Sequence, residues 1–187
     1  DNVIVKNNVV RDFEENGLSE WEGLDGIVAF GGTSDAVENI TISNNLVKNL
    51  DGRDTKGGAA GISIQGNVNG ATVTGNTVAD IGLQATTWAF GIVVRGTGND
   101  PTLTPSNVDI ITNSISSILS DPSTSTVGVG FGFEDGSAST TTVSGNTLSA
   151  TELQAEDKTF TFDLIGFIAN NTLDRAVVIR DGSGGVK

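Results

Sequence analysis

The stretch ATVTGNTVADI, residues 71–81, sets Asn76 in the middle of an otherwise strand-like run. The same arrangement recurs in ITISNNLVKNL (40–50), VDIITNSISSI (108–118) and TTVSGNTLSAT (141–151). Aligning these and two further segments gives six equivalent asparagines, spaced 25 to 37 residues apart: Asn8, Asn45, Asn76, Asn113, Asn146 and Asn171. A repeat of this length is typical of a solenoid, in which each repeat forms one coil that stacks on the next.

Apolar residues alternate with polar ones before each asparagine. Val3 and Val5 stand two residues apart, as do Val108 and Ile110, and this spacing predicts a half-buried β-strand. The asparagine then breaks the alternation, and asparagine tolerates left-handed backbone angles and bonds nearby backbone groups. We expect it to turn the chain and, because stacked strands lie about 4.8 Å apart, to bond the equivalent amide of the next coil in a ladder.

A second strand recurs later in each repeat and begins with glycine, as in GISIQGN (61–67) and GIVVRGTG (91–98). Ile62 and Ile92 are expected to point inward, and the glycine that ends each run predicts a turn. Two or more strands per coil, each parallel to its equivalent in the next coil, describe a parallel β-helix, and the usual hand of parallel crossovers makes it right-handed. The sequence therefore predicts an all-β fold, a right-handed parallel β-helix of about six coils with loop insertions, forming a single domain over 1–187.

The phrases ITISNNLV, VTGNTV and VSGNTL resemble the right-handed parallel β-helix repeat proteins of the pectin-lyase-like superfamily, and the resemblance covers nearly the whole chain. It implies the fold more than the function, because that superfamily includes polysaccharide lyases, hydrolases, epimerases, phage tailspikes, adhesins and surface proteins without chemistry. Arg95 resembles the catalytic base of its pectate-lyase-like members, an arginine on the face of a parallel strand assisted by bound calcium. The resemblance therefore makes Arg95 the candidate catalytic residue if the protein is an enzyme.

The charge balance excludes several classes of partner. The chain carries 23 acidic and 10 basic residues, a formal net charge of −13. Such a field repels phosphate backbones and anionic membrane surfaces, so nucleic acid is not an expected partner. Membrane insertion is not expected either, because no apolar run approaches the roughly 18 residues of a membrane span. An acidic, lysine-poor surface is typical of halophilic or secreted proteins, and it favours an extracellular or cell-surface location.

The residue types that the chain lacks limit its chemistry. It has no cysteine and no histidine, which removes thiolate sites, the commonest general base and the commonest zinc ligand. Catalysis would fall to Asp, Glu, Arg, Lys or a hard cation. Acidic residues gather in the segments after the first two ladder asparagines, but their spacing selects neither a catalytic pair nor a calcium loop. We therefore predict no cofactor, with calcium the one ion left open and supported by no motif.

Two tryptophans are the candidate ligand-binding residues. Trp21 and Trp88 both precede a Gly-Ile strand, so we expect them on the same side, where their rings could stack on sugar units. Asp25 and Arg95 lie nearby and could supply hydrogen bonds. The alternative is structural: each indole covers an end of the core beneath its loop, and Arg95 forms a surface ion pair with Glu134.

Three functions remain open from the sequence. The first is a non-catalytic module of a secreted or cell-surface protein that is structural, binds a polysaccharide or other glycan, or does both. The second is a polysaccharide lyase or epimerase that acts on acidic glycans through Arg95 or a loop carboxylate. The third is a filament or tailspike subunit that self-assembles. A groove that joins Arg95 to two or more carboxylates within roughly 6 Å would favour the enzyme.

Overall fold

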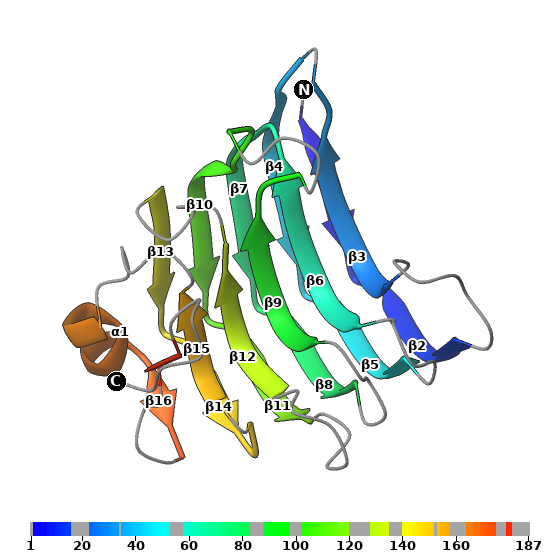
Figure 1. Cartoon of the computed structure of the whole chain (residues 1–187), viewed down its shortest axis with the longest axis vertical. Helices are drawn as coiled ribbons and strands as arrows, with labels where there is room; N and C mark the ends of the chain where they lie inside the picture. Colours follow the sequence, from blue (N-terminus) through cyan, green and yellow to red (C-terminus); the bar gives the residue numbers. More distant parts are fainter. Residues whose placement is uncertain are drawn as a thin grey trace.

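The computed structural model is a parallel β-helix, in which the chain winds through three β-sheets (Figure 1). The sheets pair strands that are far apart in sequence, and each strand runs parallel to its neighbour. The structure describes residues 2–15, 23–33, 35–52, 58–82, 88–97, 102–119, 128–134, 140–151, 153–157, 164–174 and 179–180. The predicted all-β parallel β-helix is confirmed, with three strands per coil where the sequence indicated two or more.

From β1 to β15 each sheet takes every third strand, so the three sheets repeat in the same order, and the described chain after β15 has a short helix before its last strands of sheets B and C. Sheet A consists of β1 (Val3–Lys6), β4 (Val37–Ser43), β7 (Val68–Thr74), β10 (Ser106–Ile111) and β13 (Thr141–Ser144). Sheet B consists of β2 (Val9–Glu15), β5 (Leu46–Gly52), β8 (Thr77–Ile81), β11 (Ser114–Ile118), β14 (Thr147–Ser149) and β16 (Thr172–Leu173). Sheet C consists of β3 (Leu24–Gly31), β6 (Ala59–Gly66), β9 (Ala89–Arg95), β12 (Gly128–Phe133), β15 (Leu153–Asp157) and β17 (Ile179–Arg180).

The core is a set of apolar columns that run along the axis of the solenoid. One column joins Ile42, Val73 and Ile110 of sheet A, which are partners in neighbouring strands and are fully buried. Sheet C contributes Ile62 and Ile92, which point inward as predicted. Burial of such side chains in contact with their equivalents is the main favourable contribution to folding, at about 1.5 to 3 kcal/mol each.

One short helix, α1 (Leu164–Asn170), departs from the all-β pattern and packs beside β13. Its Phe167 is buried and meets Phe131 of the core edge to face, with ring centroids 5.8 Å apart. The Nδ2 groups of Asn170 and Asn171 donate to carbonyls in the last turn, which closes the helix end. No helix in the described part of the chain is long and apolar enough to cross a membrane.

The repeated asparagines form a continuous hydrogen-bonded column between sheets A and B. The backbone N–H and the Nδ2 of Asn45 both donate to Oδ1 of Asn76, each at 2.9 Å. The second Nδ2 proton goes back to the preceding coil, as from Asn76 to the carbonyl of Ile42 at 2.9 Å. The pattern repeats along the whole column: Asn8, Asn45, Asn76, Asn113, Asn146 and Asn171. The four middle members are at most 2% exposed, so these bonds satisfy polar groups that have no access to water.

The residue before each of the first five ladder asparagines makes the turn. Asn44, Gly75 and Thr112 have φ angles of 54°, 64° and 55°, whereas the ladder asparagines do not have positive φ. The expectation that the ladder asparagine itself takes the left-handed conformation was therefore wrong. The physical reason is that its backbone N–H must point along the column to reach the next amide, so the bend falls one residue earlier. Thr112 is strained there, because a β-branched residue fits this region poorly.

We predict that Asn76→Ala lowers the free energy of unfolding by about 1 to 3 kcal/mol. The substitution leaves the buried N–H and Nδ2 of Asn45 without their acceptor. Denaturant unfolding monitored by circular dichroism measures the change. Thr77→Ala, at the next and exposed position, is the control and should stay within about 0.5 kcal/mol of wild type. Equal midpoints for the two variants would contradict the role assigned to the ladder.

We predict that Thr112→Asn raises the free energy of unfolding by about 0.5 to 1 kcal/mol, because asparagine accepts the left-handed conformation at lower cost. The reverse change, Asn44→Thr at the equivalent position, should lower it by a similar amount. Thermal melts of both variants measure the effect. A lower midpoint for Thr112→Asn would mean that the hydroxyl contact between Thr74 and Thr112, at 3.1 Å, outweighs the strain.

Candidate functional site

Three of the predicted ligand-binding residues meet on the outer face of sheet C. Arg95 Nη2 lies 3.7 Å from Oδ2 of Asp25, and Arg95 Cζ lies 5.0 Å from the centroid of the Trp88 ring. Gln65 joins them, because its Nε2 donates to Asp25 Oδ2 at 3.2 Å and to Ser63 Oγ at 2.6 Å. We call these five residues the sheet C cluster. The fourth candidate, Trp21, lies outside the described residues.

The register of sheet C explains how Trp88 reaches this place. Ala59 and Ala89 are partners, so Trp88 stands beside Gly58, the residue before Ala59. The indole lies over Gly58 and Gly23, where a β-carbon on either glycine would collide with the ring. Two residues further along the strand, the Phe90 ring centroid lies 5.8 Å from that of Trp88.

Trp88 thereby borders a second, smaller apolar cluster on the outside of the sheet. Its members are all buried: Ala60, Phe90, Val93 and Val129. With glycine backbone, Phe90 and Arg95 in contact with its ring, Trp88 contributes mainly to packing. These contacts favour the structural alternative for Trp88 over sugar stacking.

Asp25 is the most perturbed charge of the sheet C cluster. Its side chain is only 15% exposed, and Oδ1 is buried with no hydrogen-bond partner in the described part of the chain. Loss of water raises the pKa of Asp25, while the Arg95 guanidinium and the Gln65 amide act in the opposite direction. The Asp25 carboxylate also holds Arg95 against Trp88, which favours a structural role for this arginine.

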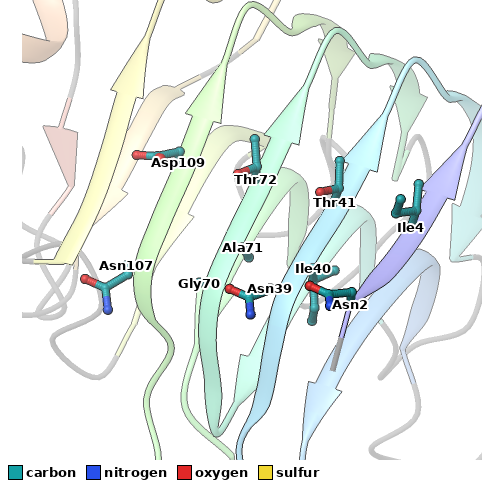
Figure 2. A pocket seen from close by; sticks show the side chains of 10 residues that line it. All are labelled: Asn2, Ile4, Asn39, Ile40, Thr41, Gly70, Ala71, Thr72, Asn107 and Asp109. Carbon is teal, nitrogen blue, oxygen red and sulfur yellow. The ribbon is translucent and has the colours of Figure 1, made fainter.

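A second candidate site is a groove on the outer face of sheet A, with a volume of about 370 Å³. Figure 2 shows that side chains from four strands line it in two rows. We call it the sheet A groove, and its lining residues are Asn2, Ile4, Asn39, Ile40, Thr41, Gly70, Ala71, Thr72, Asn107 and Asp109.

The local backbone builds one wall of the groove. Asn39, Gly70 and Asn107 have φ angles of 56°, 80° and 55°, and they interrupt the regular pairing of β4, β7 and β10 at equivalent places. The register is the same on both sides of these residues, so each strand bends at a left-handed residue without an inserted one, and Asn39 and Asn107 are exposed there. The buried Ile40 and Ala71 lie directly after the left-handed residues and belong to the core.

Sequence reasoning missed the sheet A groove, although a signal was present. Asn2, Asn39, Gly70 and Asn107 each stand six residues before a ladder asparagine. This second column of asparagine and glycine marks a repeated left-handed position, in the same way as the residue directly before the ladder. The outward threonines Thr41 and Thr72 carry no such signal, because threonine suits any solvated strand.

The groove offers uncharged hydrogen-bonding groups and one carboxylate. The amides of Asn2, Asn39 and Asn107 and the hydroxyls of Thr41 and Thr72 both donate and accept, which suits sugar hydroxyls. One amide is already engaged, because Nδ2 of Asn107 donates to Oδ1 of Asn69 at 2.8 Å. Within the described ranges, no group of three or more Asp or Glu residues is arranged to hold a metal ion.

Comparison with known proteins adds no relative to this picture. No protein-family model, curated protein or solved structure matches the chain. The resemblance to pectin-lyase-like repeats therefore rests on the sequence phrases, and the structure supports its coarser part, a parallel β-helix.

The raised pKa of Asp25 predicts a specific pH dependence. Because the folded pKa lies above the unfolded value near 3.8, the stability associated with this group is greatest below pH 3.8 and is lost as the pH rises through the folded pKa. The Asp25→Asn variant has no carboxyl at this position, so it does not lose stability in this way. The free energy of unfolding of the variant, measured against wild type from pH 3.5 to 7, should therefore improve as the pH rises. A constant difference over this range would contradict the assignment.

Proposed function

We propose that the protein is a non-catalytic β-helix module of the extracellular space or cell surface, and that it binds a neutral carbohydrate in the sheet A groove. The observation that carries the proposal is the groove itself, a hollow of about 370 Å³ lined by amides and hydroxyls from four strands. Binding sites for small ligands typically have volumes of about 300 to 1,000 Å³. The structural role of such a module follows from the same stack of coils.

The lining residues are held by the β-helix and not by loops. Thr41 and Thr72 are partners in β4 and β7, and Asp109 is the partner of Thr72 in β10. Their backbones are fixed by the ladder of parallel strands, so little conformational freedom is left to lose on binding. Preorganisation of this kind supports affinity even where each hydrogen bond is worth only about 1 kcal/mol.

The charge of the chain points to a neutral ligand. A net charge of −13 repels a polyanionic polysaccharide over distances of about a Debye length, 8 Å at physiological ionic strength. Amides and hydroxyls, by contrast, bind uncharged sugar hydroxyls without a counterion. We therefore assign neutral glycans to the groove in preference to acidic ones.

The alternative is a lyase or epimerase acting on acidic glycans through Arg95. It requires Arg95 to be free to take up a proton beside several carboxylates. Arg95 forms an ion pair with Asp25, and Trp88 lies against its guanidinium. This arrangement supports packing more than proton transfer, so the non-catalytic function is the better supported of the two.

We predict that neutral polysaccharides such as mannan, xylan or dextran slow the protein in affinity gel electrophoresis and that polygalacturonate does not. Thr41→Ala combined with Thr72→Ala should weaken binding about tenfold, because two hydrogen bonds of about 0.5 to 1.5 kcal/mol are lost. Thr77→Ala combined with Thr147→Ala is the matched control, since both threonines are exposed on sheet B. This control pair should bind as wild type does.

Three outcomes would contradict the proposal. Unchanged binding by the Thr41 and Thr72 variant would remove the groove from consideration. Loss of binding in Arg95→Gln, together with unchanged binding by the Thr41 and Thr72 variant, would place the site in the sheet C cluster instead. Release of unsaturated sugar products that stops in Arg95→Gln would establish the lyase.

A further inference from the structure

We infer that the ligand of the sheet A groove is an internal stretch of a linear, extended glycan that lies along the solenoid axis, with one sugar unit over each coil. The inference rests on the proposed function and adds the form and direction of the ligand. It follows from how the lining residues are arranged across the strands.

The two rows of the groove run perpendicular to the strands. Ile4, Thr41, Thr72 and Asp109 are successive partners in β1, β4, β7 and β10, and they form one row in Figure 2. The other row consists of the residues two positions earlier in the chain, Asn2, Asn39, Gly70 and Asn107. A ligand that touches all four coils must therefore cross the strands and follow the axis.

The spacing of the rows suits a sugar chain. Adjacent strands lie about 4.8 Å apart, so the distance from the first to the fourth strand is about 14 Å. One pyranose unit of an extended chain has a length similar to the spacing of two adjacent strands. Each coil then presents the same pair of positions to each unit, with a residue of the asparagine and glycine row on one side and a strand side chain two residues later on the other.

The two ends of the groove differ in chemistry. Ile4 is 68% exposed and apolar, which suits the C–H face of a sugar ring. Asp109 at the other end is exposed and accepts hydrogen bonds from hydroxyl donors. The hydroxyls of Thr41 and Thr72 lie between them. A chain long enough to reach both ends places a C–H face on Ile4 and a hydroxyl donor at Asp109, so both ends add to its affinity.

The test measures affinity against chain length. Gluco-, manno- and xylo-oligosaccharides of one to six units are titrated by isothermal calorimetry. We expect the dissociation constant of the preferred series to fall with each unit up to four and then to level off. Equal affinity for a monosaccharide and a hexasaccharide would overturn the inference and show that the groove binds a chain end. Binding of none of the series, with no polysaccharide retarding the protein, would refute the proposed function itself.

Variants at the ends of the groove test whether the ligand extends over all four coils. Asp109→Ala and Ile4→Ala should each weaken the tetrasaccharide three- to tenfold and the disaccharide less, because a disaccharide can bind over the remaining coils. Thr72→Ala, at the centre, should weaken both lengths to a similar extent. An end variant that weakens every length equally would contradict the extended alignment. Circular dichroism melts check that each variant is folded.

Discussion

The hydrogen bonds between stacked asparagine amides are the constraint on which the rest of the structure depends. Each amide accepts two protons from the preceding coil and donates to it and to the next. A strand that slipped by one residue would turn its apolar set to the outside and would also break this column. The ladder therefore fixes the register of sheets A and B on its two sides, and the rows of the groove inherit that register.

Much of the fold could be predicted because the ladder and the apolar columns are both periodic in the sequence. The inward positions around Asn76, such as Val73 and Val78, are the buried ones. The location of the bend could not be obtained in the same way, since Asn44 and Asn45 are chemically identical and only the direction of the amide column separates their roles. The helix α1 was also missed, because its seven residues are too few for a helical period to be evident.

The candidate sites were less predictable, for a physical reason. The sequence indicated that Trp88, Asp25 and Arg95 face the same side, and they do meet on sheet C. What the Trp88 ring contacts depends on its rotamer and on which residues of other coils leave room for it. One row of the sheet A groove lies at left-handed backbone positions, and an asparagine or glycine at such a position looks in the sequence like one in any other turn.

The placement of Trp88 over glycines has a consequence for how the sequence can change. Gly58 has no side chain, and the indole of the next coil fills the space that one would occupy. A larger residue at position 58 is therefore tolerated only after Trp88 has been replaced, and the loss of Trp88 alone leaves an empty hollow above a glycine. The order in which substitutions arise then decides which combinations survive. Residues that touch across neighbouring coils of this face must therefore be substituted together, although they lie in different stretches of the sequence.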